Sequence, residues 1–74
     1  MPQIPNVYKI VGDAVRAERL KAGLSQEQLA EKCNLARNYI GNIERAEKRI
    51  SLETLARVAK ALNVKPENLV RGAR

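Results

Sequence analysis

Apolar residues recur with a helical period along the first third of the chain. From Val7 onward they follow the i, i+4, i+7 spacing of one helix face, which predicts a helix from about Val7 to Ala22. Gly23 follows, and glycine readily takes the left-handed conformation that ends many helices. Residues 1–6 hold two of the three prolines and are expected to form an extended arm. The inner face of this helix is assigned to Val7, Val11, Ala14, Val15 and Ala22.

The next two apolar stretches are short and are bounded by local capping signals. Ser25 and Gln28 have the spacing of a capping box, in which each side chain accepts a hydrogen bond from the other residue's backbone N–H. Asn34 is expected to end this second helix in a left-handed conformation. A third helix is predicted from about Arg37 to Arg45. The inner faces of these two helices are assigned to Leu29, Ala30, Cys33, Ile40 and Ile43.

The last third of the chain predicts two further helices. Ser51 is the N-cap of the fourth, Glu53 is favourable in its first turn, and Asn63 ends it. Proline suits a first helical position, so a short fifth helix is expected from Pro66 to about Val70, before a basic tail at 71–74. The inner face of the fourth helix is assigned to Leu52, Leu55, Ala59 and Leu62, flanked by Val58.

The sequence has no strand pattern, so we predict a compact all-α domain of five helices over residues 7–70. Only residues 34–36 link the second and third helices. So short a link forces a sharp crossing, which is the arrangement of a helix-turn-helix.

The net charge and the numbers of His and Cys residues limit the classes of function that the chain can have. Fourteen Lys and Arg against eight Asp and Glu give a net charge of +6, which favours nucleic acid as a partner, although a basic soluble surface gives the same balance. With no His and one Cys, the chain offers no catalytic cluster, metal site or internal disulfide, and Cys33 is interpreted as a small buried hydrophobe. No signal peptide or membrane-spanning stretch is apparent. We therefore expect a cytoplasmic protein that is not an enzyme and needs no cofactor.

Three blocks of the sequence resemble the XRE-type helix-turn-helix family, which includes the lambda and 434 repressors, Cro and the controller proteins of restriction-modification systems. The blocks are Gly23-Leu24-Ser25-Gln26-Glu27-Gln28-Leu29-Ala30, Tyr39-Ile40-x-x-Ile43-Glu44-Arg45 and Ser51-Leu52-Glu53-Thr54-Leu55. The resemblance covers about residues 10 to 70 and implies a lambda-repressor-like fold and a transcriptional regulator. The small size and basicity resemble the controller proteins most. The chain departs from the family at Ala36, which lacks a capping hydroxyl, and at Asn34, Ala46 and Lys65.

The third helix is the expected recognition helix. With Ile40 and Ile43 inside, its outer face carries the candidate base contacts, because Arg pairs with guanine and Asn with adenine in the major groove. Gly41 has two explanations, a close approach of the duplex or close packing against a neighbouring helix. The candidate base contacts are Arg37, Asn38, Gly41 and Asn42.

Phosphate contacts are expected around this helix. Gln26 stands in the first turn of the second helix, where free N–H groups attract phosphate, and its family counterpart anchors the DNA backbone. Four residues that flank the recognition helix are further candidates, although any one of them could be merely solvated: Tyr39, Arg45, Lys48 and Arg49.

The resemblance also implies roles for two further pairs of residues. The positions of Arg19 and Glu44 form a partly buried ion pair in the family; alternatively they are unrelated surface charges, with Glu44 facing Lys48. Acidic residues at the positions of Glu27 and Glu31 contact RNA polymerase in some family activators, whereas an ordinary solvated helix face is the simpler interpretation.

The resemblance also implies a homodimer on double-stranded DNA. A single helix reads few base pairs, so pairing about a two-fold axis is expected to provide the selectivity. The dimer interface is assigned to Val64, Leu69 and Val70, although these residues could instead seal the base of the monomer. The alternative function is a protein-interaction module such as an antitoxin-like domain, for which the outer face of the third helix would be apolar.

Overall fold

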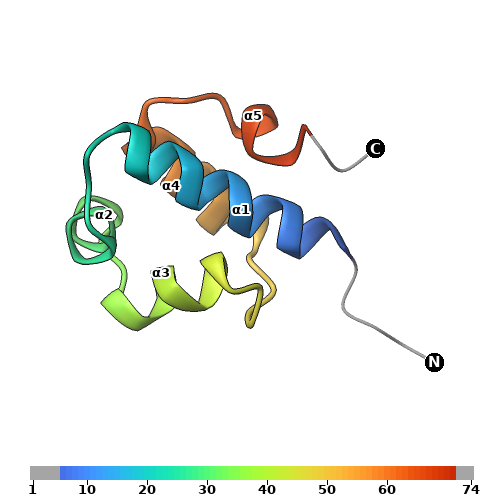
Figure 1. Cartoon of the computed structure of the whole chain (residues 1–74), viewed down its shortest axis with the longest axis horizontal. Coiled ribbons are helices and arrows are strands. Elements are labelled where there is room, and N and C mark those ends of the chain that lie inside the picture. The colour runs from blue at the N-terminus through green and yellow to red at the C-terminus, as the bar shows by residue number, and fades with distance from the viewer. Residues whose placement is uncertain (1–5, 72–74) are drawn as a thin grey trace.

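The computed structural model describes residues 6–71, and within that range all regular structure is helical, as the sequence predicted (Figure 1). Figure 1 shows α2 nearly end-on and α3 running across the view, so the two helices cross steeply. Asn6 opens α1 and so does not belong to an arm; the rest of the expected arm and residues 72–74 lie outside the described range. The helices are α1 (Asn6–Lys21), α2 (Gln26–Cys33), α3 (Arg37–Glu44), α4 (Leu52–Leu62) and α5 (Pro66–Val70).

Local capping chemistry fixes the helix ends. The Ser25 Oγ accepts from the Gln28 backbone N–H at 3.0 Å, and the Gln28 Oε1 accepts from the Ser25 N–H at 2.8 Å, which completes the predicted capping box. Asn34 and Asn63 both adopt the left-handed conformation, with φ of 59° and 60°. Ser51 caps α4 by accepting from the Thr54 N–H at 3.0 Å. These ends therefore depend only on residues a few positions apart.

Two positions around α3 lack the residue that would favour the local backbone. Ala36 is the N-cap of α3 and provides no side-chain hydrogen bond. Ala46, just beyond the helix, has φ of 59°, a conformation that glycine adopts without the steric cost of a Cβ atom. Because α3 has a weak start and a strained exit, it depends on packing against α1 and α2 for its position.

The core is aliphatic and lies between α1, α4 and the inner faces of α2 and α3. Two of the predicted core positions are wrong. Leu52 is 84% exposed, because it starts α4 and its side chain faces outward. Ala22 is exposed, because α1 ends at Lys21. The fully or nearly fully buried apolar residues are Val11, Val15, Leu29, Ala30, Cys33, Ile40, Ile43, Leu55, Val58, Ala59, Leu62 and Leu69.

Cys33 is a buried hydrophobe, as predicted, with 1% of its surface exposed. Burial raises the pKa of its thiol, and the positive charge of Arg57 opposes this only in part. Since the thiolate is the reactive form, the side chain has a packing role.

Gly12 sets how closely α1 approaches α3. A Cβ atom at this position would overlap the carbonyl oxygen of Ile43 and lie 2.9 Å from that of Glu44. Both neighbours are backbone atoms at the end of α3, so neither can rotate away. The two helices can be this close only because residue 12 has no side chain.

Candidate DNA-binding surface

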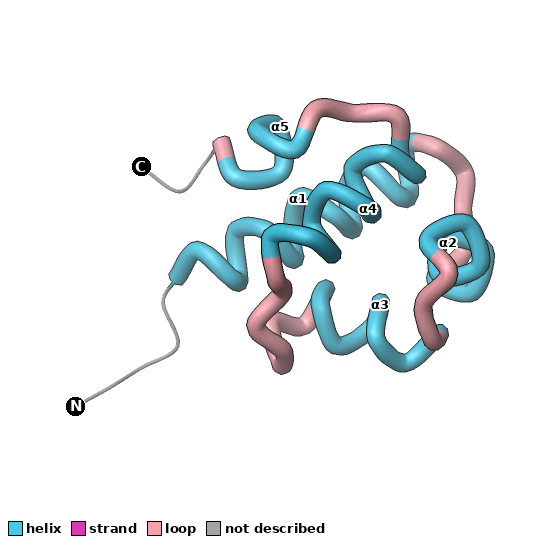
Figure 2. Tube along the Cα trace, turned by 180° about the vertical axis from the view of Figure 1, so that it is seen from behind, coloured by secondary structure: helices cyan, strands magenta, loops and turns pink. Residues whose placement is uncertain are grey.

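The recognition helix predicted from the sequence lies on the outside of the bundle. In both views α3 and α5 lie on opposite sides of α1 and α4 (Figures 1 and 2). Ile40 and Ile43 are buried, at 0% and 2% exposure, and hold the inner face. The outer face carries Arg37 and Asn38, which are exposed, and Asn42, which is half-buried. Three polar side chains that can contact base edges therefore lie on one accessible face.

A buried ion pair joins α1 to this helix. The Arg19 Nε lies 2.6 Å from the Glu44 Oε2 and its Nη2 lies 3.1 Å from the Oε1, a bidentate geometry. The Arg19 Nη1 donates to the Leu24 carbonyl oxygen at 2.8 Å. The two side chains are 9% and 3% exposed. Glu44 therefore faces Arg19 inside the domain and is not one of a set of unrelated surface charges.

Gln26 is tied into the same network. Its Nε2 donates to the Glu44 Oε1 at 3.0 Å, so its amide nitrogen faces inward and its Oε1 lies above Gly41. Toward a phosphate, Gln26 can therefore offer its second Nε2 hydrogen and its backbone N–H in the first turn of α2. Glu44 thus orients the start of α2 as well as the end of α3.

Arg45 does not point away from α3 but lies back along its outer face. Its Nη2 donates to the Asn42 Oδ1 at 3.0 Å, and its Nε lies 3.2 Å from the Glu47 Oε1. A Cβ atom on Gly41 would lie 3.0 Å from the Arg45 Nη1 and 3.5 Å from the Gln26 Oε1. Gly41 is therefore covered by the flexible ends of side chains and not by the backbone of a neighbouring helix.

The remaining phosphate candidates surround the exit of α3. Lys48 is exposed in the loop, and Tyr39 is half-buried against the core. The Arg49 guanidinium lies over the ring of Tyr8, 5.9 Å from its centroid, which anchors the loop to the start of α1. The loop's positive charges are thereby held beside the recognition helix.

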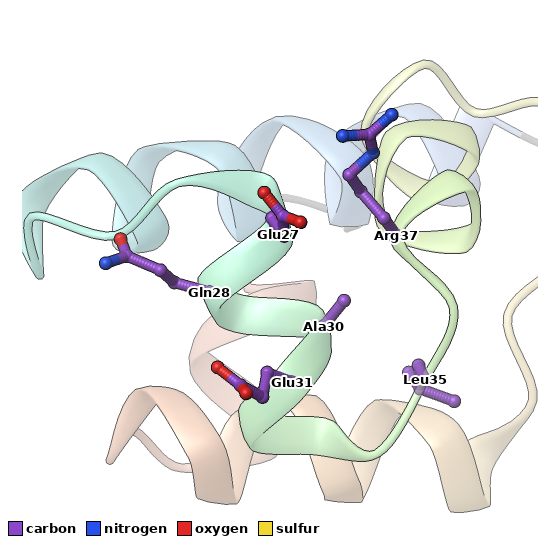
Figure 3. Close-up of a pocket in the computed structure, with 6 residues that line it drawn as sticks. All are labelled: Glu27, Gln28, Ala30, Glu31, Leu35 and Arg37. Atoms are coloured by element: carbon purple, nitrogen blue, oxygen red, sulfur yellow. The ribbon is translucent and has the colours of Figure 1, made fainter.

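An open hollow separates α2 from the start of α3. Its lining includes Glu27 and Glu31 on the exposed side of α2 and Arg37 on α3 (Figure 3). Figure 3 shows Leu35 in the link between the two helices, next to Ala30. The two acids are solvent-accessible and lie one turn apart, as the sequence predicted.

The three residues assigned to a dimer interface differ in accessibility. Leu69 is 0% exposed and belongs to the core of a single protomer. Val64 and Val70 are half-buried. Val70 borders an apolar hollow of about 240 Å³ that gathers residues from three segments: Val7, Tyr8, Val11, Ile50, Leu52 and Leu55.

Sequence reasoning missed four contributors to this surface: Gly12, Tyr8, Glu47 and the inward bond of Gln26. Only Gly12 left a signal, since it is a glycine within the predicted first helix, one residue after the core position Val11. Tyr8, Glu47 and Gln26 act through side-chain contacts with Arg49, Arg45 and Glu44, and no periodic pattern in the sequence predicts these contacts.

Within residues 6–71 we find neither a helix long and apolar enough to cross a membrane nor a cluster of three side chains suited to a metal ion.

Comparison with known proteins defines the class. A profile of helix-turn-helix proteins matches residues 15–69, most of the chain. The chain belongs to the helix-turn-helix family and is a DNA-binding transcriptional regulator, not an enzyme. This confirms the assignment made from the three sequence blocks.

Within that class the chain is similar to restriction-modification control proteins. It is 42% identical over 66 residues to the control protein C.BamHI from Bacillus amyloliquefaciens, covering 88% of this chain and 82% of that protein. It is 45% identical over 65 residues to the control protein C.SmaI from Serratia marcescens, covering 88% and 77%. Its structure matches that of the restriction-modification controller protein C.AhdI from Aeromonas hydrophila with a TM-score of 0.81 and 37% identity, covering 84% and 94%.

Proposed function

We propose that this protein binds a near-palindromic operator as a homodimer, with α3 of each protomer in the major groove. The observation that carries the proposal is the polar outer face of α3, where Arg37, Asn38 and Asn42 are accessible above a fully buried inner face. An antitoxin-like binding module would instead present an apolar face at this position. An operator-binding protein works where the DNA is, which agrees with the expected cytoplasmic location.

Selection of bound sequences from a random duplex pool tests this function. We expect a site with two related half-sites about one helical turn apart. Affinity for it should fall steeply with salt, because lysine and arginine contacts to phosphates release counterions. A pool without an enriched sequence, or binding that hardly changes with salt, would contradict the proposal.

Arg37→Ala and Lys48→Ala should have different effects on that site. We assign Arg37 to a base contact, so its loss should cost about 1–3 kcal/mol and relax the preference at one position. We assign Lys48 to a phosphate of the DNA backbone, so its loss should weaken binding to all sequences alike. Affinities measured on the selected site and on single-base variants of it separate the two effects, and equal loss of selectivity in both variants would overturn the assignment.

We further propose that the dimer forms over the apolar hollow beside Val70 rather than through the buried Leu69. The hollow and the exposed Leu52 are adjacent on one face, and such a surface can complement itself about a two-fold axis. Leu52→Glu should give a monomer in sedimentation experiments at micromolar concentration. Leu20→Glu is the matched control, because Leu20 is the other exposed large hydrophobe among residues 6–71, at 56%. A monomeric wild-type protein, or an unchanged dimer in Leu52→Glu, would overturn this assignment.

Glu27 and Glu31 support a further role, contact with a basic surface of RNA polymerase. Both side chains are accessible on α2 and line the hollow in Figure 3, across which Arg37 lies on α3. The double variant Glu27→Ala/Glu31→Ala should retain operator binding but lose stimulation of transcription in a purified system. Glu53→Ala, which removes an exposed acid from α4, is the control. Equal stimulation of transcription by the wild type, the double variant and Glu53→Ala would show that Glu27 and Glu31 are only solvated.

A further inference from the structure

Asn42 and Arg45 are joined by a hydrogen bond on the outer face of α3. The guanidinium of Arg45 carries donors only, so the Asn42 atom that faces it at 3.0 Å must be the carbonyl oxygen Oδ1. The amide nitrogen Nδ2 of Asn42 then remains free. The hydrogen-bonding groups that the pair exposes therefore differ from those of an asparagine without a partner.

Two other contacts keep the guanidinium in this place. Gly41 lies beneath it, because an added Cβ atom would be only 3.0 Å from the Arg45 Nη1. The Glu47 Oε1 lies 3.2 Å from the Arg45 Nε and holds the side chain from the loop. Arg45 is thereby directed along the reading face of α3 and not toward the flanking backbone, where the sequence placed it.

Apart from the second lone pair of Oδ1, the free groups of the pair are hydrogen-bond donors: the Asn42 Nδ2 and the remaining N–H groups of the Arg45 guanidinium. Adenine offers the major groove an acceptor, N7, and a donor, N6, so a lone asparagine reads it by using both Oδ1 and Nδ2. With Oδ1 turned toward Arg45 and one of its lone pairs already used, the N6 donor of adenine must share this oxygen with the guanidinium, which weakens a bidentate pair with adenine. Guanine offers two acceptors, N7 and O6, which match two donors.

We propose that Asn42 and Arg45 act as one reading unit that selects guanine, with Glu47 and Gly41 as the residues that position it. The inference rests on the proposed function and adds the base that this part of α3 recognises. It replaces two expectations from the sequence, in which Asn42 reads adenine alone and Arg45 holds a phosphate.

Selection from a random duplex pool with wild-type protein, Asn42→Ala, Arg45→Ala and Arg49→Ala tests the unit. The base that Asn42 faces is the position whose preference is lost in Asn42→Ala. In the wild type we expect guanine there. Arg45→Ala should lower the preference for guanine over adenine roughly tenfold to a hundredfold and shift it toward adenine, because Oδ1 is freed. Arg49→Ala, which removes a loop charge stacked on Tyr8, should bind more weakly but keep the guanine.

Circular dichroism and thermal melting of each variant show that any change in preference comes from a folded protein. Adenine in the wild-type site at this position, or guanine retained in Arg45→Ala, would overturn the reading unit while leaving the DNA-binding function intact. If the wild-type protein enriches no sequence, the proposed function fails, and the reading unit fails with it.

Discussion

Replacing Glu44 with alanine should lower the free energy of unfolding by about 3–5 kcal/mol, which is typical for a buried ion pair that loses one partner. The Arg19 guanidinium would remain in a site where its side chain is 9% exposed, with the Leu24 carbonyl as its one remaining acceptor in the network. Gln26 would lose its acceptor as well. A small domain has a free energy of unfolding near the low end of about 5–15 kcal/mol, so this variant should be partly unfolded at room temperature. Urea denaturation measures the change.

A double-mutant cycle with Arg19→Ala shows whether the two side chains act together. We expect the double variant to lose much less stability than the sum of the single variants, because each single change leaves an uncompensated charge. Asp13→Ala is the control: Asp13 pairs with Lys9 at 3.4 Å, but both side chains are mostly exposed, so its loss should cost less than about 1 kcal/mol. Additive effects of Arg19→Ala and Glu44→Ala, or a loss as small as that of the control, would contradict the structural role given to the pair.

The Gly12→Ala variant should lose at least about 2 kcal/mol of stability, although alanine is the better helix former. Its methyl group would overlap the Ile43 carbonyl oxygen and press on that of Glu44. Since neither backbone atom can move independently, α3 as a whole must move away from α1. This shift would also stretch the Arg19–Glu44 pair, so the recognition helix should lose its position along with the domain's stability. Thermal melting should show a decrease of roughly 8 °C or more, given about 4–8 °C per kcal/mol for a domain of this size.

Gly41→Ala is the matched control for that experiment. It makes the same chemical change in the middle of another helix, but the new methyl group meets only the ends of the Arg45 and Gln26 side chains. These can move by a few tenths of an ångström, so the helix-forming advantage of alanine should dominate and stability should rise by up to about 1 kcal/mol. If the two alanine variants behave alike, backbone crowding at Gly12 is not what sets the distance between α1 and α3.

The amino-acid sequence by itself determined the local structure of this protein. Helix ends depend on residues a few positions apart, so Ser25 with Gln28, Ser51, Asn34 and Asn63 could be interpreted without any tertiary information. The three-residue link between α2 and α3 then required a sharp crossing, and the polar positions opposite Ile40 and Ile43 identified the recognition face. A pairing between Arg19 and Glu44, 25 residues apart, came only from the family resemblance.

Tertiary structure decided which side chains are covered and which polar atoms meet. The sequence pattern assigned Leu52 to an inner face and Leu69 to a dimer interface, but Leu52 lies at the open start of α4 and Leu69 lies inside the core. The sequence alone does not show why a glycine stands within a helix, because the reason depends on which atoms of other elements lie next to it. Gly12 faces backbone atoms of α3, whereas Gly41 faces the ends of side chains. The direction of Arg45 was decided in the same way. Its side chain could reach either the flank or the face of α3, and only the arrangement of Asn42, Gly41 and Glu47 around it placed its guanidinium on the reading face.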